Sequence, residues 1–174
     1  MIQSRKPGPV DFLKEHHAQI DGEIAKFEES LRELRYSGGG TLPRHIRQLR
    51  QAMELFYLRL SRHVALEEQV FFPFMEKYVP RFEPMISFFK SEHESLRKNH
   101  EAVASSLKRF SRGRPDLNAG RELERLRGTA TYLIYLLRNH AKVEDESIYK
   151  SANRDLNADE KAELARRIRD YQYS

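Results

Sequence analysis

The chain has 174 residues, no cysteine and no tryptophan, and 33% of its residues are charged. Lysine and arginine number 31 against 26 acidic residues, a formal charge of +5 that leaves out seven histidines. The length favours one domain, residues 1–174, with one core. The lack of cysteine excludes a disulfide framework, a thiolate metal site and a thiol nucleophile. We see no apolar run of the roughly 18 residues that a membrane span needs and no secretory signal. We therefore expect a cytoplasmic protein with no membrane partner.

Glycine and proline group around residues 7–9, 37–43, 73–84 and 112–118. The stretches between these groups hold about 30 residues each, enough for a helix of roughly 40 Å. Their apolar residues recur at spacings of three and four, which predicts helices that pack in a bundle. The residues that set this pattern in the first and third stretches are Val10, Leu13, Ile20, Ile24, Phe27, Leu31 and Leu34, then Ile86, Phe89, Leu96, Val103, Leu107 and Phe110. In the second and fourth they are Leu49, Met53, Phe56, Leu60, Val70 and Phe74, then Leu126, Ala130, Leu133 and Leu137.

A shorter helix is expected over residues 158–171. Asn157 and Glu160 have the spacing of a capping box at its start, and Leu164, Ile168 and Tyr171 form a stripe that should pack on the bundle. The predicted fold is therefore all-α. It is an antiparallel up-down-up-down four-helix bundle over residues 10–150, followed by a short C-terminal helix.

Polar residues interrupt the apolar pattern in all four long stretches. An unpaired imidazole or carboxylate at a core position would cost several kcal/mol. Polar residues at several core positions therefore need a common cause. Six of them fall about two turns from one end of the bundle, and they are His17, His63, Glu67, His93, His140 and Glu144. Four imidazoles and two carboxylates suit iron, with manganese or zinc possible. Six protein ligands are many for one ion, which favours two.

An internal repeat supports the same set. FLKEHHAQI at 12–20 aligns with FFKSEHESL at 88–96, an offset of 76. HVALEEQVFFP at 63–73 aligns with HAKVEDESIYK at 140–150, an offset of 77. The alignment pairs His17 with His93 and Glu67 with Glu144, so it selects His17 as the ligand candidate and leaves His16 beside it.

The pattern LK-x-x-H, then H-x-x-x-E-E-x-x-x-F-P, then a degenerate copy of both resembles the hemerythrin-like, HHE cation-binding family over residues 10–150. The resemblance implies a non-haem di-iron centre bridged by an oxo or hydroxo group. In such a centre Glu67 and Glu144 would be bridging ligands, and His17, His63, His93 and His140 would be terminal ligands. It is closest to the six-ligand bacterial type.

One position departs from the oxygen-carrying members, which have a fifth histidine where this chain has Arg97. Fewer ligands leave more open positions on the metals, so we expect the protein to bind, sense or react with oxygen, nitric oxide or peroxide. Iron storage, iron delivery or iron-centre repair is an alternative, although the repair branch carries a cysteine that is missing here. A di-iron oxidase or peroxidase is another alternative, and whether the protein is an enzyme stays open.

The remaining polar residues have less specific interpretations. His100 lies two turns beyond His93 and is expected to be a core histidine bonded to Tyr57 or Tyr132, with a proton relay as the alternative. Asp145 could replace Glu144 as a ligand, but Asp145 and Glu68 are expected to bond to the ligand histidines or to water. His45 is expected on the surface.

The basic residues alternate with glutamates on the exposed helix faces, which does not favour nucleic-acid binding. If nucleic acid did bind, Arg109, Arg112 and Arg114 would be the expected contact.

Overall fold

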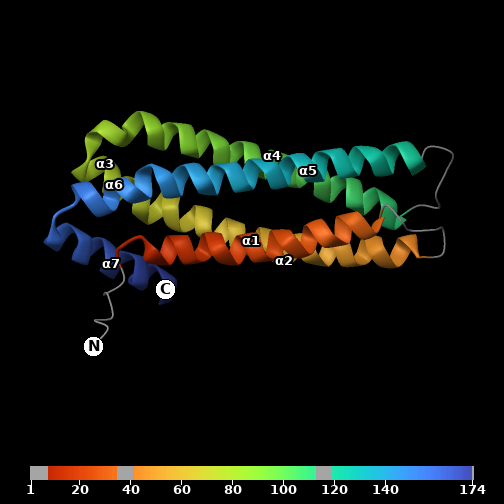
Figure 1. Cartoon of the computed structure of the whole chain (residues 1–174), viewed down its shortest axis with the longest axis horizontal. Coiled ribbons are helices and arrows are strands. Elements are labelled where there is room, and N and C mark those ends of the chain that lie inside the picture. The colour runs from red at the N-terminus through yellow and green to blue at the C-terminus, as the bar shows by residue number, and fades with distance from the viewer. Residues whose placement is uncertain (1–7, 35–40, 113–118, 174) are drawn as a thin grey trace.

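The structure, a computed structural model, describes residues 8–34, 41–112 and 119–173 (Figure 1). These residues form helices and turns without a strand. The long helices are α1 (Asp11–Glu33), α2 (Leu42–Leu66), α4 (Glu83–Arg112) and α5 (Ala119–Glu146). The shorter elements are a π-helical turn (Glu67–Phe71), α3 (Phe72–Tyr78), a 3-10 turn (Pro80–Phe82), α6 (Ile148–Asp155) and α7 (Ala158–Tyr173). No helix in the described ranges is long and apolar enough to cross a membrane.

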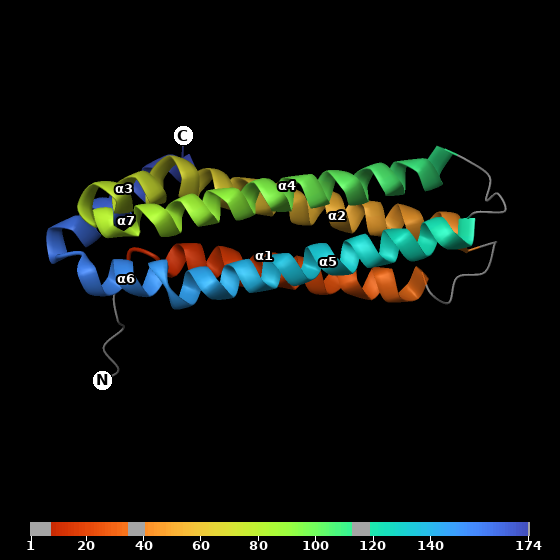
Figure 2. The ribbon, with the colours of Figure 1, turned by 90° about the horizontal axis from the view of Figure 1, so that it is seen from above.

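The four long helices form one antiparallel bundle. Helix α1 contacts α2 and α5, and α4 contacts the same two helices, so each long helix has two neighbours. Figures 1 and 2 show the four helices running alongside one another, with α3, α6 and α7 gathered at one end. The predicted all-α bundle with an additional C-terminal helix is confirmed.

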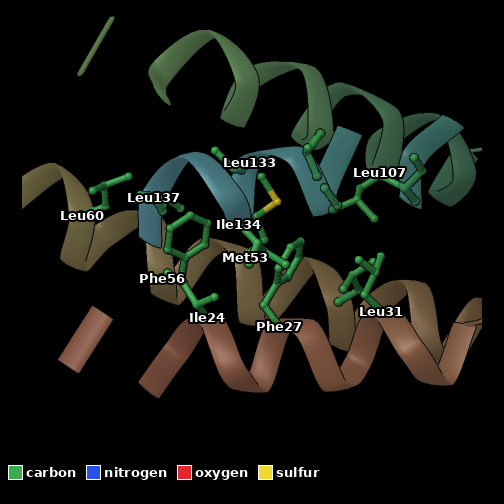
Figure 3. Close-up of a cluster of buried hydrophobic side chains, with 14 of the residues drawn as sticks. Ile24, Phe27, Leu31, Met53, Phe56, Leu60, Leu107, Leu133, Ile134 and Leu137 are labelled. Carbon is green, nitrogen blue, oxygen red and sulfur yellow. The ribbon is translucent and has the colours of Figure 1, made fainter. Parts of the chain in front are cut away.

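Apolar side chains fill the bundle as two clusters. The first runs along the half away from α7, and Figure 3 shows how Phe27, Met53 and Phe56 meet between the helices. The second joins the bundle end to α3, α6 and α7 and contains Leu13, Phe89 and many aromatic side chains. Between the two clusters lies a layer of buried polar residues.

The second predicted stretch is a broken helix in the structure. At its π-helical turn the Phe72 N–H donates to the carbonyl of Glu67, five residues back, and the next residue, Pro73, has no N–H to donate. The wider turn shifts the register by one residue. Phe71 therefore becomes fully buried, whereas Val70, which the apolar spacing placed in the core, is only partly buried.

The fourth stretch also ends earlier than expected. Ser147, with φ −113° and ψ −88°, leaves helical geometry and separates α5 from α6. Beyond α6 the predicted capping box is confirmed, because Asn157 N–H donates to Glu160 at 2.8 Å and the Asn157 side chain accepts from the Glu160 N–H at 3.0 Å. The predicted stripe of α7 packs on the second apolar cluster through Leu164 and Ile168.

Candidate metal centre

Six polar side chains converge between the two apolar clusters. They come from the four long helices and from the π-helical turn. Each is at most 7% exposed, and they are His17, His63, Glu67, His93, His140 and Glu144. Apolar residues around them are also buried, among them Leu13, Ile20, Leu60, Phe71, Leu96 and Leu137. The structure thus brings together the six residues that the sequence pattern singled out.

Their donor atoms form two overlapping groups of four. One group joins His17 and His63 to Glu67 and Glu144, and the other joins His93 and His140 to the same two glutamates. Within each group the potential ligand atoms lie within 4.8 Å of one another. The paired imidazoles face each other through Nε2 atoms, at 2.9 Å for His17 with His63 and 3.1 Å for His93 with His140.

The carboxylates show that the groups fit metal ions. Glu67 Oε2 lies 3.4 Å from His63 Nε2 and 3.3 Å from His93 Nε2, so it faces both imidazole pairs. Glu144 Oε2 lies 3.3 Å from His17 Nε2 and from His140 Nε2. Glu67 Oε2 and both Glu144 oxygens are buried and accept no hydrogen bond. Buried carboxylate oxygens without donors are costly unless a cation neutralises them.

The other ring nitrogen of three histidines is held by a carboxylate at the rim of the site. His17 Nδ1 donates to Asp145 at 3.2 Å, His93 Nδ1 to Glu68 at 2.8 Å, and His140 Nδ1 to Glu92 at 3.0 Å. Such bonds fix the tautomer that leaves Nε2 free to bind a metal. The expectation that Glu68 and Asp145 bond to the histidines is therefore confirmed, and neither belongs to the two groups of four.

A family model for the hemerythrin HHE cation binding domain matches residues 8–170. The chain belongs to this family. The match covers nearly the whole chain and includes the C-terminal helix, which lay beyond the stretch recognised from the motifs. No curated protein and no solved structure gave a significant match.

One residue of this hemerythrin domain was missed from the sequence. Tyr149 is fully buried, stacks on His17 with ring centroids 5.4 Å apart, and donates a hydrogen bond from its hydroxyl to Glu67 Oε1. In the repeat it corresponds to Phe72, which stacks in the same way on His93 at 5.8 Å. The aligned segments contain this difference, but only the structure shows that the extra hydroxyl reaches a carboxylate.

The electrostatics of the two glutamates differ. Burial, together with the nearby charge of Glu67, raises the pKa of Glu144 to about 6. Burial also opposes ionisation of Glu67, but the imidazoles of His63 and His93 outweigh it and hold the pKa of Glu67 below its usual value. Both carboxylates are therefore mainly ionised at neutral pH, and Glu144 is the first of the two to take up a proton as the pH falls.

The histidines differ as well. Burial opposes the charged form of His17, but its hydrogen bond to Asp145 and the nearby Glu144 carboxylate prevail and raise its pKa to about 9. Burial likewise opposes the charged form of His93, yet Glu67 and the other carboxylates raise its pKa. Burial lowers the pKa of His63 to about 3. The protonated imidazole of His17 therefore balances part of the negative charge of the buried carboxylates at neutral pH when no metal is bound.

The remaining histidines lie outside the two groups. His100 stacks face to face on Tyr57 with centroids 3.5 Å apart, and its buried Nδ1 makes no hydrogen bond, so the predicted hydrogen bond to tyrosine is replaced by ring stacking. Tyr132 is exposed. His45 is partly exposed, and His16 is half-buried beside His63.

Arg97 and Arg109 also lie outside the two groups of four. Arg97, 40% exposed, pairs with Glu94 and Glu68. Arg109 donates to Ser106. Arg114 and the side chain of Arg112 lie outside the described residues.

Proposed function

We propose that this hemerythrin-domain protein holds two iron ions in its bundle and uses them to bind or react with oxygen, nitric oxide or peroxide. The observation that carries the proposal is the pair of overlapping groups of four, which share two carboxylates with three free oxygens. One ion would be held by His17 and His63, and the other by His93 and His140. Glu67 and Glu144 would serve both.

The donor set favours iron. Imidazole nitrogens and carboxylate oxygens without a thiolate suit iron, and manganese and zinc remain possible by the same chemistry. When bound, iron with positions left open by the protein offers a site where a small ligand can coordinate and exchange electrons. Arg97 faces Glu94 and Glu68, so no fifth histidine fills such a position from that helix turn.

The protein itself supplies orientation and shielding. Asp145, Glu68 and Glu92 hold the imidazoles with Nε2 pointing inward, and Tyr149 holds Glu67. The apolar clusters on both sides exclude bulk water, which strengthens electrostatic interactions inside.

A cavity of about 130 Å³ lies beside His93 and is lined by Leu60, Val64 and Leu96 among others. A water molecule occupies about 30 Å³ in the liquid. The cavity therefore has room for a diatomic molecule or a peroxide beside His93.

Metal analysis combined with absorption spectra tests the proposal. After loading with ferrous iron, we expect two ions per chain and a near-ultraviolet ligand-to-iron absorption in air that differs from the spectra under argon and with nitric oxide. His93→Gln and Glu144→Gln should remove this absorption, while His45→Gln, outside both groups of four, should leave it unchanged. Clearly fewer than two ions per chain in the unmodified protein would contradict the di-iron centre.

The same preparation separates the alternative functions. Reversible binding of oxygen or nitric oxide without loss of iron supports a carrier or sensor. Transfer of iron to a chelator or to an iron-free acceptor supports storage or delivery, and sustained peroxide consumption supports an oxidase or peroxidase. The cytoplasmic location stays a prediction, to be checked by fractionation.

A further inference from the structure

The internal repeat extends beyond the six converging residues to the groups that hold them. Asp145 accepts from His17 Nδ1, and Glu68 accepts from His93 Nδ1. The two acceptors are themselves 77 residues apart, the same offset that relates the two H-x-x-x-E segments. The two halves of the centre are therefore alike in the carboxylates that support His17 and His93.

The second pair of supports is not alike. Glu92 accepts from His140 Nδ1 at 3.0 Å. In the repeat His140 corresponds to His63, and Glu92 corresponds to His16, at the offset of 76. The carboxylate that supports one histidine is thus replaced by an imidazole beside the other.

The contacts around His63 show the consequence. His63 Nδ1 is buried and makes no hydrogen bond, and neither does the buried Nδ1 of His16. The two rings meet edge to face with centroids 5.7 Å apart. The pocket beside His16 is lined by Arg59 and Arg62 and by no acidic side chain. Among the residues that the structure describes, no carboxylate bonds to His63 Nδ1.

A carboxylate on the second ring nitrogen of a metal-binding histidine orients the ring and makes it a stronger ligand. Removing such a partner typically lowers metal affinity about 10- to 100-fold. Both glutamates belong to both groups of four, so they do not compensate one half alone.

We propose that the two metal positions are unequal, because His16 stands where the other half of the repeat has the supporting carboxylate of Glu92. The position at His93 and His140 is the tight one, and the position at His17 and His63 is the weak, exchangeable one. This inference rests on the proposed two-metal centre and adds which ion is retained and which exchanges with solution.

Stepwise titration of the metal-free protein with Co²⁺, followed by calorimetry and by visible absorption, tests the inference without any activity assay. We expect two binding steps whose dissociation constants differ by about 10- to 100-fold. His63→Gln should abolish the weak step and His140→Gln the tight step. His16→Glu, which copies Glu92, should tighten the weak step about tenfold or more and leave the tight step in place.

The reciprocal variant Glu92→His should weaken the tight step by a similar factor, so the inference does not depend on one substitution. His45→Glu makes the same chemical change as His16→Glu away from the centre and should alter neither step. The inference is wrong if His16→Glu and Glu92→His both leave each dissociation constant within about twofold of the unmodified protein. Failure of the unmodified protein to bind two ions would instead refute the proposed function.

Discussion

The hydrogen bond from Tyr149 to Glu67 offers a direct test of how the polar layer is stabilised. In Tyr149→Phe the ring keeps its place against His17 and Phe71, while the buried Glu67 carboxylate loses a donor. Water cannot take the place of the hydroxyl, because Tyr149 and Glu67 are both fully buried. Hydrogen bonds to charged groups contribute about 1.5–3 kcal/mol to stability, and nothing compensates a buried acceptor that has lost its donor.

We therefore expect metal-free Tyr149→Phe to lose about 1.5–3 kcal/mol of unfolding free energy at pH 8. For a domain of this size that corresponds to a melting temperature lower by roughly 3 to 12 °C. The Tyr149 hydroxyl stabilises the Glu67 carboxylate mainly when the carboxylate is ionised. The difference in unfolding free energy between the unmodified protein and Tyr149→Phe should therefore become smaller as the pH falls. Urea unfolding followed by circular dichroism measures it.

Tyr135→Phe is the matched control, since it removes the same hydroxyl from a side chain that is 64% exposed. Such a surface change should stay within about 0.5 kcal/mol. Equal stabilities of the two variants would refute the argument that the Tyr149 hydroxyl stabilises the buried carboxylate.

Further predictions concern pH, charge and packing. His17 has a folded pKa of about 9, so its imidazolium stabilises the metal-free protein fully below pH 6.5 and loses this effect as the pH rises to 9. Metal affinity should rise over pH 7–9 by up to about 100-fold, with proton release visible by calorimetry in two buffers. Glu144, with its pKa raised to about 6, is destabilising when ionised, so Glu144→Gln should stabilise the metal-free protein at pH 8 by about 2 kcal/mol while abolishing binding of two ions. Phe27→Ala, at a fully buried position, should cost about 3–5 kcal/mol in urea unfolding.

The fold could be predicted because its determinants are local. The spacing of Leu13, Ile20 and Ile24 defines one helix face regardless of what packs on it. The π-helical turn could not be predicted in this way. It changes the register by one residue and buries Phe71 in place of Val70, and simple apolar spacing cannot distinguish the two neighbours.

The converging residues could be predicted for a different reason. A histidine or glutamate at a core position contradicts the apolar pattern, and the repeat makes the same contradiction twice, as with His63 and His140. Tyr149 gave no such signal, because an aromatic residue at a core position agrees with the pattern whether or not its hydroxyl has a function. Its role depends on a contact with Glu67, 82 residues away in sequence.

The two halves of the repeat agree at the positions that face the centre and differ at positions behind them. Positions whose donor atoms point into the centre agree in type between the halves, so a metal would meet two imidazoles on either side. The positions behind them differ, with Tyr149 against Phe72 and His16 against Glu92. Ligand type decides which metals can bind, whereas the groups behind the ligands set affinity and charge. The inequality of the two halves therefore has to be read from hydrogen bonds such as that of His140, and from their absence at His63.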